Sequence, residues 1–307
     1  MIFEFCIPIQ TGGGKRQNMM TGRWFTRRHF LKGLLGGPLL FCFLIQTPKM
    51  MAGHSPPATL RGRGSIAQFF RGEELVYEIG FWLFKRVALG KLSFVETEQR
   101  GQYRATLHAE TQGIVGWLSH YRSDTYSSTV EEVEGGSRLR PLVFEEKVRV
   151  GNRVDQRVTQ FNYVQRKWIT VRREKDGTLQ RVEEEIPSGK IYDDFLTASY
   201  NFRYGAYGAI EKGRTYSIPA VSRKGATCYE VRVASEDEEW EKKKSEKTRD
   251  GKEIFVQFLF DPEITHSKEG RIEGWLSKEL LPVEGRLKDV SILGDVKGTL
   301  IKSNEQR

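Results

Sequence analysis

From Glu74 onward, apolar and polar side chains alternate along most of the chain with a period of two residues. The alternation is clearest in four segments, which are 75–83, 103–110, 142–150 and 229–234. A period of two is typical of β-strands that bury one face and expose the other. In 254–260 both alternating sets are largely apolar, which predicts a strand covered on both sides.

Short turns separate these segments and favour antiparallel neighbours. Asp176-Gly177 and Asp250-Gly251 each lie between strand-like runs, and Asp-Gly supplies the positive φ angles that tight hairpins need. Gly135-Gly136 and Gly151-Asn152 mark two further reversals. No long linker divides the chain after residue 70. The pattern predicts a mainly β protein of roughly a dozen strands, with a single large antiparallel curved sheet or open barrel and one or two short helices.

Two stretches interrupt the alternation and predict the short helices. Residues 113–120 fit a single helical turn. In 192–204, four side chains fall at helical spacing, which are Phe195, Leu196, Ser199 and Phe202. Asp193 or Asp194 is well suited to cap the start of this helix, because a carboxylate accepts hydrogen bonds from the free N–H groups of a first turn.

The segment 236–250 is densely charged, with seven acids and five cations. Two Glu residues precede two Lys residues by four positions, the spacing of ion pairs on a helix surface: Glu238 before Lys242, and Glu239 before Lys243. We nevertheless predict a solvated, extended hairpin tip that ends at Asp250-Gly251. A docking site for a charged partner is the alternative interpretation.

The 307 residues include 49 Lys and Arg against 40 Asp and Glu, which gives a net charge of +9. Seven of those cations and a single acid, Glu4, fall within residues 1–60, so this segment carries six of the nine net charges. The remainder is nearly balanced, which excludes a strong general case for nucleic-acid binding. A chain with 38% hydrophobic and 11% aromatic residues is also not intrinsically disordered.

The basic N-terminal segment has the layout of an export signal. Arg27 and Arg28 are followed by Phe30, Leu31 and Lys32, which resembles the twin-arginine signal, and an apolar run extends over 33–45. That run lies between Lys32 and Lys49, which are separated by 16 residues, fewer than the roughly 20 residues of a spanning helix. An ordinary secretion signal with an incidental Arg pair remains the alternative.

These features divide the chain into three parts. We expect a twin-arginine export signal in 1–53, a flexible lead-in over 54–69 and a β-rich envelope domain over 70–303. Translation from Met19 or Met20 would also be compatible with the signal. We therefore expect the twin-arginine export machinery as a partner, a periplasmic or envelope-associated location, and no stable transmembrane span in the mature form.

No motif for phosphate binding, acyl transfer or metal binding is present in the sequence. None of the His residues after position 53 has another His or Cys at ligand spacing, so we expect no metal, no cofactor and no catalytic residue. Asp193 and Asp194 are the alternative acid/base pair, because adjacent carboxylates that turn into one cavity can share a proton. We expect instead that one caps the helix and the other faces water.

Three segments, in matching order and spacing, together resemble the exported bacterial domain-of-unknown-function family 3108 over roughly residues 70–300. They are Gly72-Glu73-Glu74-Leu75-Val76-Tyr77 with Ala88-Leu89-Gly90, Tyr192-Asp193-Asp194-Phe195 with Arg203, and Trp275-Leu276-Ser277 with Leu281-Pro282-Val283. One departure is Lys278-Glu279, where the family pattern has an Asp. The resemblance implies a β-rich envelope domain of unassigned biochemistry and brings no catalytic residues. More distantly, such domains look like the open barrels that carry lipoproteins or lipids across the periplasm.

We therefore expect a non-enzymatic binding or carrier domain for an amphiphilic envelope ligand, such as a lipid. Six aromatic side chains are candidates to line its binding site, which are Tyr77, Phe81, Phe195, Tyr200, Phe258 and Phe260. One alternative is an enzyme acting on cell-envelope glycans, with Asp193 or Asp194 as acid or base. The other is an envelope assembly scaffold that acts through the charged segment 236–250.

Overall fold

The computed structural model describes residues 64–81, 84–173, 177–246, 252–260, 262, 267–290 and 294–304 of the chain. The expected export signal, with Arg27 and Arg28, lies outside the described residues, as does the turn Asp250-Gly251. Most of the expected lead-in over 54–69 is likewise outside them.

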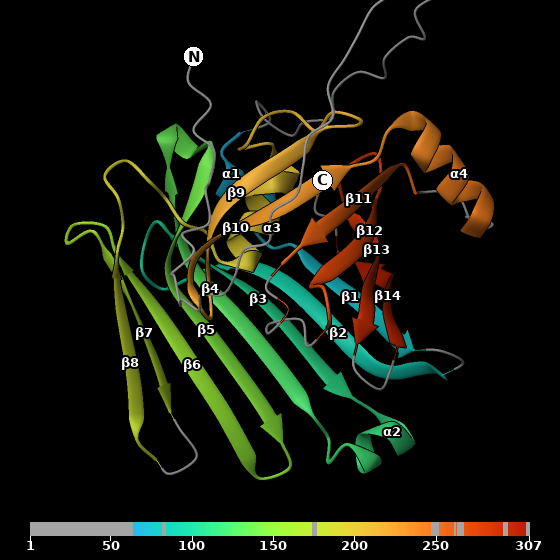
Figure 1. Cartoon of the computed structure of the whole chain (residues 1–307), viewed down its shortest axis with the longest axis horizontal. Coiled ribbons are helices and arrows are strands. Elements are labelled where there is room, and N and C mark those ends of the chain that lie inside the picture. Colours follow the sequence, from blue (N-terminus) through green and yellow to red (C-terminus); the bar gives the residue numbers. More distant parts are fainter. Residues whose placement is uncertain are drawn as a thin grey trace, which may run out of the picture. The chain divides into compact units, whose positions relative to one another are not determined.

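Fourteen antiparallel strands form one open sheet in the described part of the chain, which confirms the predicted mainly β fold (Figure 1). The first eight strands are β1 (Glu74–Phe81), β2 (Phe84–Glu96), β3 (Gln102–Thr111), β4 (Ser123–Val133), β5 (Arg138–Val150), β6 (Arg153–Asn162), β7 (Lys167–Arg173) and β8 (Leu179–Glu185). The last six are β9 (Thr215–Ser222), β10 (Gly225–Val233), β11 (Ile254–Leu259), β12 (Arg271–Leu276), β13 (Pro282–Val290) and β14 (Gly294–Ser303).

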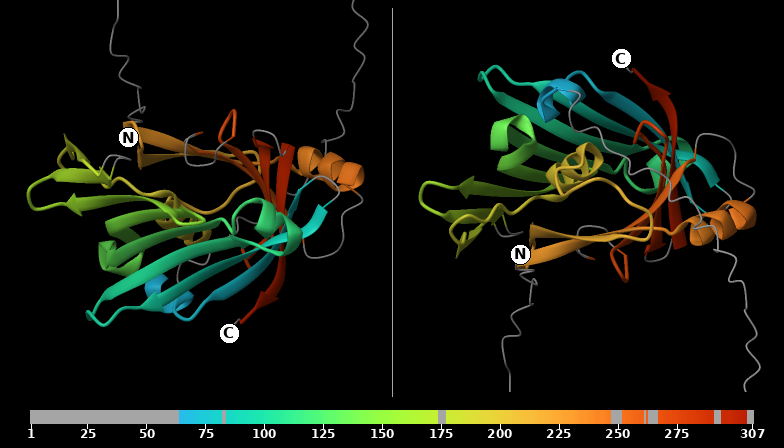
Figure 2. Two further views of the ribbon diagram at one scale, coloured as in Figure 1. Left: turned by 90° about the horizontal axis from the view of Figure 1, so that it is seen from below. Right: turned by 90° about the horizontal axis from the view of Figure 1, so that it is seen from above.

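The strand order joins two meanders. β8 to β1 follow one another in reverse order, β1 then pairs with β14, and β14 to β9 complete the sheet. The two edge strands are therefore β8 and β9, which are consecutive in the chain. Figure 2 shows the sheet curling over, so that β9 and β10 lie opposite the long strands β3–β5.

Helix α3 (Phe195–Tyr204) lies between these two walls of the sheet and contacts β3, β4, β5 and β9. Immediately before it, the main chain of Asp193 pairs with the free edge of β9, with hydrogen bonds to Pro219 and Val221 of 2.9 and 3.1 Å. The connection from β8 to β9 thus places α3 inside the sheet and covers the free edge of β9. This cover matters because an unpaired strand edge can pair with other chains.

The alternating pattern assigned the inward face correctly. On β3, Ala105 is fully buried and Tyr103 stacks on Phe94, whereas Arg104 is exposed. On β10, Tyr229 and the alternating valines after it are buried in the same core. Period-two alternation therefore identified the strands and their core side, because each strand of a one-sided sheet buries every second residue.

The charged segment after β10 corrects one prediction. Residues 236–246 form α4 (Glu236–Glu246), an α-helix, where we expected an extended hairpin tip. The helix packs on the outer face of β11–β13, where the indole N–H of Trp275 donates to Glu246 at 3.1 Å and Lys242 pairs with Glu273 at 2.9 Å. The four-residue spacing of its Glu and Lys residues was the correct signal: Lys243 pairs with Glu239 at 3.0 Å.

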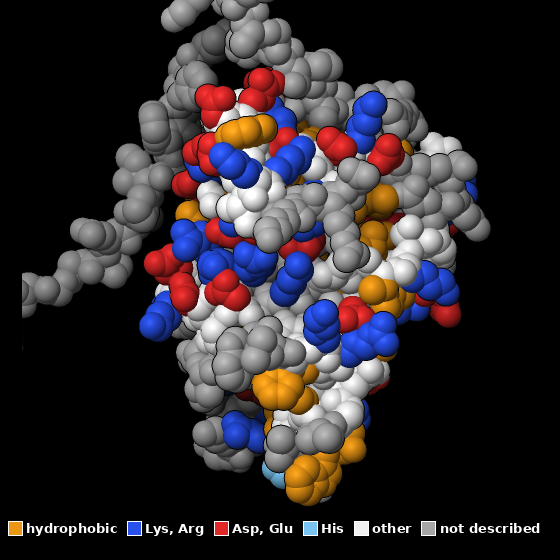
Figure 3. Space-filling view, turned by 90° about the vertical axis from the view of Figure 1, so that its right-hand side faces the viewer, with side chains coloured by type: hydrophobic (Ala, Val, Ile, Leu, Met, Phe, Trp, Pro, Cys, Tyr) orange, Lys and Arg blue, Asp and Glu red, His pale blue; other side chains and the backbone are white. Residues whose placement is uncertain are grey.

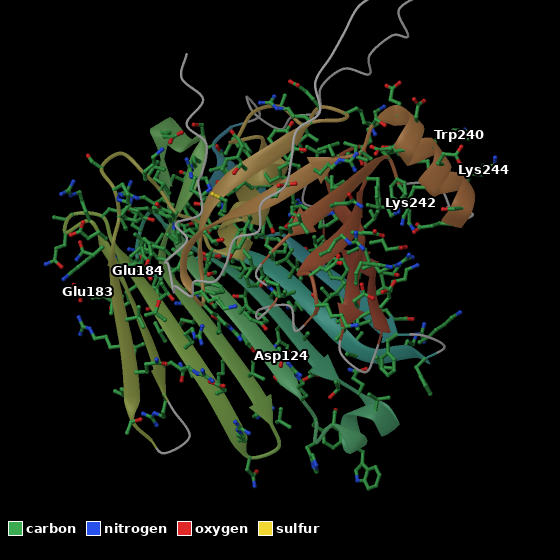
Figure 4. The ribbon with its side chains drawn as sticks, viewed as in Figure 1. Asp124, Glu183, Glu184, Trp240, Lys242 and Lys244 are labelled. Atoms are coloured by element: carbon green, nitrogen blue, oxygen red, sulfur yellow. The ribbon has the colours of Figure 1, made fainter. Side chains whose placement is uncertain are left out.

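With α4 in place, β11 is covered on both faces, as its largely apolar sequence predicted. Phe255 packs against Trp275 on the outer side, and Val256 is fully buried on the inner side. Figure 3 shows Lys and Arg interspersed with Asp and Glu on the surface that carries α4, and Figure 4 shows Trp240 and Lys244 on this helix.

Two short helices complete the described fold. α2 (Gly113–Leu118) lies in the segment predicted to form a helical turn and contacts β2 and β3. α1 (Ile66–Phe70) lies at the end of the expected flexible lead-in. This segment is helical because one of its faces is buried, through Ile66, Ala67 and Phe70, and because Ser65 caps its start. No helix among the described residues combines the length and apolarity needed to cross a membrane.

Arg203 near the end of α3 joins three parts of the domain. Its guanidinium donates to both carboxylate oxygens of Glu73, at 2.8 and 2.6 Å, and to the carbonyl of Leu280 at 2.9 Å. It also lies over the ring of Phe70, 4.7 Å from the centroid. Burial lowers the pKa of Arg203, but the Glu73 carboxylate outweighs burial and raises the pKa above its ordinary value. The ion pair thereby ties α3 to the start of β1 and to the turn before β13.

We expect Arg203→Met to lower the free energy of unfolding by about 3–5 kcal/mol, because it leaves the carboxylate of Glu73 buried without its partner. Urea unfolding followed by tryptophan fluorescence measures the change. Arg71→Met is the control, since Arg71 pairs with Glu96 through largely exposed side chains and should change stability little. Equal effects of the two substitutions would contradict the assigned role of Arg203.

Candidate functional site: an apolar groove inside the curved sheet

Two adjoining spaces of about 370 and 490 Å³ lie between α3 and the inner face of the sheet. We call them together the apolar groove. The seven residues that border both spaces are all apolar and come from α3 and from both halves of the sheet: Ile79, Leu107, Phe195, Phe260, Ile272, Leu287 and Val296. Because the same side chains line both spaces, the groove is continuous from the Pro282 end of β13 to the residues around α2.

All six aromatic residues predicted from the sequence border this groove. Tyr77, Tyr200 and Phe258 line the smaller space, Phe81 lines the larger one, and Phe195 and Phe260 line both. Phe195, the first residue of α3, packs edge-to-face against Tyr126, Phe144 and Phe260, which holds it at the centre of the groove. The structure therefore brings the six together, while their role in ligand binding stays a prediction.

A row of glycines makes room for the groove on the red strands of Figure 1. Gly274, Gly285 and Gly298 are direct cross-strand neighbours on β12, β13 and β14, and all three border the smaller space. A Cβ atom built on Gly285 has no heavy atom within 4 Å. Since a side chain at Gly285 would project into open space, the absence of side chains at these three positions is one cause of the hollow.

Polar side chains hold α3 in its place beside the groove. The carboxylate of Asp194 caps the helix by accepting from the N–H groups of Leu196 and Thr197, at 2.9 and 3.0 Å. Its other oxygen accepts from the hydroxyls of Ser128 and Thr197, at 2.6 and 2.8 Å. This confirms the predicted cap and occupies both oxygens of Asp194 with structural contacts.

Asn201 anchors the middle of the helix to β5. Its amide accepts from the N–H of Leu139 at 2.8 Å and donates to the carbonyl of the same residue at 2.9 Å. A buried amide that satisfies both backbone groups of one residue fixes the helix in rotation and in height, because any shift would leave those groups unpaired.

We expected the second carboxylate to face water, and this expectation is wrong for Asp193, which is fully buried. One oxygen accepts from the Tyr207 hydroxyl and from the Asn201 amide, and the other lies 3.6 Å from the guanidinium of Arg138. Burial raises the pKa of Asp193 to about 6, although Arg138 acts to lower it. Burial likewise raises the pKa of Asp194.

The two carboxylates face different partners. Asp194 binds the N–H groups of α3 and a hydroxyl of β4, while Asp193 lies between Arg138, Asn201 and Tyr207. Neither borders the apolar groove. The alternative acid/base role stays a prediction that these contacts do not favour. The described residues hold no group of three or more His, Cys, Asp or Glu arranged for a metal ion.

The buried Asp193 predicts a pH dependence of stability. The folded protein holds the proton up to a pKa of about 6, whereas the unfolded chain releases it near the ordinary value of 3.8. Stability from this group is complete below pH 3.8 and is lost as pH rises through 6, by about 3 kcal/mol in total. Urea unfolding from pH 3.5 to 8 measures the free energy of unfolding of wild type and of Asp193→Asn. The stability of wild type relative to the variant should fall steadily between pH 3.8 and about 6, as the unfolded chain releases the proton and the folded protein keeps it, and then level off above pH 6. A constant difference would show that the pKa is not raised.

Sequence reasoning missed most of the groove. Ile79 and Leu107 fall within the alternating segments 75–83 and 103–110, but the alternation does not distinguish a side chain that borders the groove from one that packs in the core. The glycines at inward positions of β12–β14 were the available signal, because glycine in a strand interior leaves no side chain to pack. Its meaning depends on cross-strand register, which brings Gly274, Gly285 and Gly298 into one row.

Comparison with known proteins agrees with the motif segments. The family model described as "Protein of unknown function (DUF3108)" matches residues 76–300, and the chain therefore belongs to this family. The match includes the helix segment with Arg203 and the closing segment from Trp275 to Val283. Comparisons with curated proteins and with solved structures found no match.

Proposed function

We propose that this member of the DUF3108 family is a non-enzymatic binding or carrier domain that holds the apolar part of an amphiphilic ligand in the groove. The observation that carries the proposal is a continuous groove bordered by apolar side chains from α3 and from both halves of the sheet. Water in such a space is displaced favourably by a hydrocarbon chain.

The dimensions of the groove support a lipid-sized ligand. Its two spaces, of about 370 and 490 Å³, each fall within the usual range for small-molecule sites. The sheet that surrounds them is open, since β8 and β9 do not pair.

Export belongs to the same proposal. The Arg27-Arg28 pair with its following apolar run supports passage through the twin-arginine machinery to the periplasm or envelope. In that compartment a protein with an apolar groove would meet lipids and other envelope amphiphiles.

Blocking the groove tests the proposal. Gly285→Phe places a large side chain where a Cβ meets no neighbour, so it should fill the groove with little effect on folding. Thr299→Phe is the matched control, because Thr299 is exposed on the adjacent strand β14. We expect wild type and the control to take up a fluorescent fatty-acid probe, and Gly285→Phe to lose at least about tenfold in affinity, equivalent to about 1.4 kcal/mol.

Native mass spectrometry of gently purified protein, followed by lipid extraction, provides the second measurement. Co-purified lipid in the wild type and its loss in Gly285→Phe are the expected results. Repeated recovery of wild type without lipid, together with no probe uptake, would refute the carrier proposal. Unchanged thermal unfolding of Gly285→Phe guards against loss of binding through misfolding.

A further inference from the structure

A second hollow, of about 430 Å³, lies on the inner face of β5–β7 and has the opposite character to the groove. We call it the arginine pocket. Five guanidinium groups border it, from Arg122, Arg153, Arg157, Arg172 and Arg223, together with only two carboxylates, from Glu146 and Asp155. After residue 60, positive and negative side chains are almost equal in number, so this concentration of positive charge is local.

Three of the arginines have carboxylate partners. Arg223 pairs with the buried Glu146, with Nε donating to the carboxylate at 3.1 Å, and Arg172 pairs with Asp155 at 3.1 Å. Arg122 forms a two-pronged contact with Asp124, at 2.9 Å through both Nε and Nη2. Asp124 is labelled on β4 in Figure 4. These pairs neutralise three charges and leave two arginines, Arg153 and Arg157, as the positive excess.

Arg157 occupies the centre of the pocket. It lies directly across from Glu146 on β5 and from Arg172 on β7. Its Nη1 atom is shielded from solvent and has no hydrogen-bond partner among the described residues. Burial lowers the pKa of Arg157. Arg157 as a whole is half-buried, but an N–H group withdrawn from water without an acceptor is costly, and a bound anion would remove that cost.

The arginine pocket adjoins the apolar groove. Arg122 borders both the pocket and the larger space of the groove. The pocket wall itself continues with Val148 and Val150, which are apolar. One elongated molecule can therefore lie along the inner face of the sheet, with its hydrocarbon in the groove and a charged end among the arginines.

We propose that the ligand of this domain is an anionic amphiphile, whose carboxylate or phosphate head group binds in the arginine pocket at Arg157. This inference rests on the proposed function and specifies its ligand class. Planar guanidinium groups bind carboxylate and phosphate through paired N–H donors, which makes several converging arginines selective for such head groups over neutral ones.

A matched pair of probes tests the charge preference. A fluorescent long-chain fatty acid and its methyl ester share the same hydrocarbon and differ in the charge of the head group. Wild type should bind the acid at least about tenfold more tightly than the ester, an advantage typical of charge-assisted hydrogen bonds. Arg157→Gln should abolish this preference and leave ester binding unchanged. Arg149→Gln is the control, since it removes the same charge from an exposed position on β5.

The outcomes separate this inference from the proposed function. Uptake of both probes with equal affinity, unaffected by Arg157→Gln, would overturn the anionic ligand while leaving the carrier function intact. Failure of both probes would overturn the carrier function and with it the amphiphile.

Inorganic phosphate provides the remaining arm of the test. A rise in melting temperature with phosphate that is absent in Arg157→Gln, combined with no uptake of either probe, would assign the pocket to a free anion and overturn the amphiphile. Phosphate that competes with the fatty acid but not with the ester supports the proposal. Since binding at the guanidinium is electrostatic, the preference for the acid should also weaken as salt is raised.

Discussion

The position of α3 inside the curled sheet depends on buried polar contacts along its length. Asp194 at its start, Asn201 in its middle and Arg203 near its end each satisfy groups of the surrounding domain. Hydrophobic burial alone would tolerate rotation or sliding of the helix, because apolar contacts are not directional. The polar contacts remove that freedom. They therefore determine that Phe195 faces the groove and that the space beside it stays unfilled by the helix.

The inner face of the sheet changes character along its width. Around β1–β3 and β11–β14 it is apolar and includes glycines, whereas across β5–β7 it presents arginines. The cross-strand sequence Glu146, Arg157 and Arg172 places charges side by side on a face that is elsewhere hydrophobic. A concave surface that is apolar at one end and cationic at the other is complementary to an anionic amphiphile. It would determine the orientation of the bound ligand as well as its position.

The strands and their inward faces could be predicted because each follows from local alternation, as for Tyr103 and Ala105. The cap at Asp194 was equally local. We assigned the segment of α4 to an extended hairpin although its Glu and Lys spacing was that of a helix. The contact that docks this helix, between Glu246 and Trp275, joins residues 29 positions apart and has no local sequence signal. The burial of Asp193 and the clustering of Arg157 with other charged side chains depend on residues of other strands. No local sequence pattern contains that information.

The pairing of β1 with β14 sets the order in which the domain can be completed. Leu75 lies opposite Ser303, so β1 finds one of its neighbours only after all the strands from β2 to β13 have been synthesised. Until then the two meanders have no ladder joining them, and the inner edge of β1 is unpaired. Contacts over such sequence separations form slowly. The groove is therefore completed only after β14 has been synthesised, and a chain truncated before β14 would lose the centre of its sheet and not an edge.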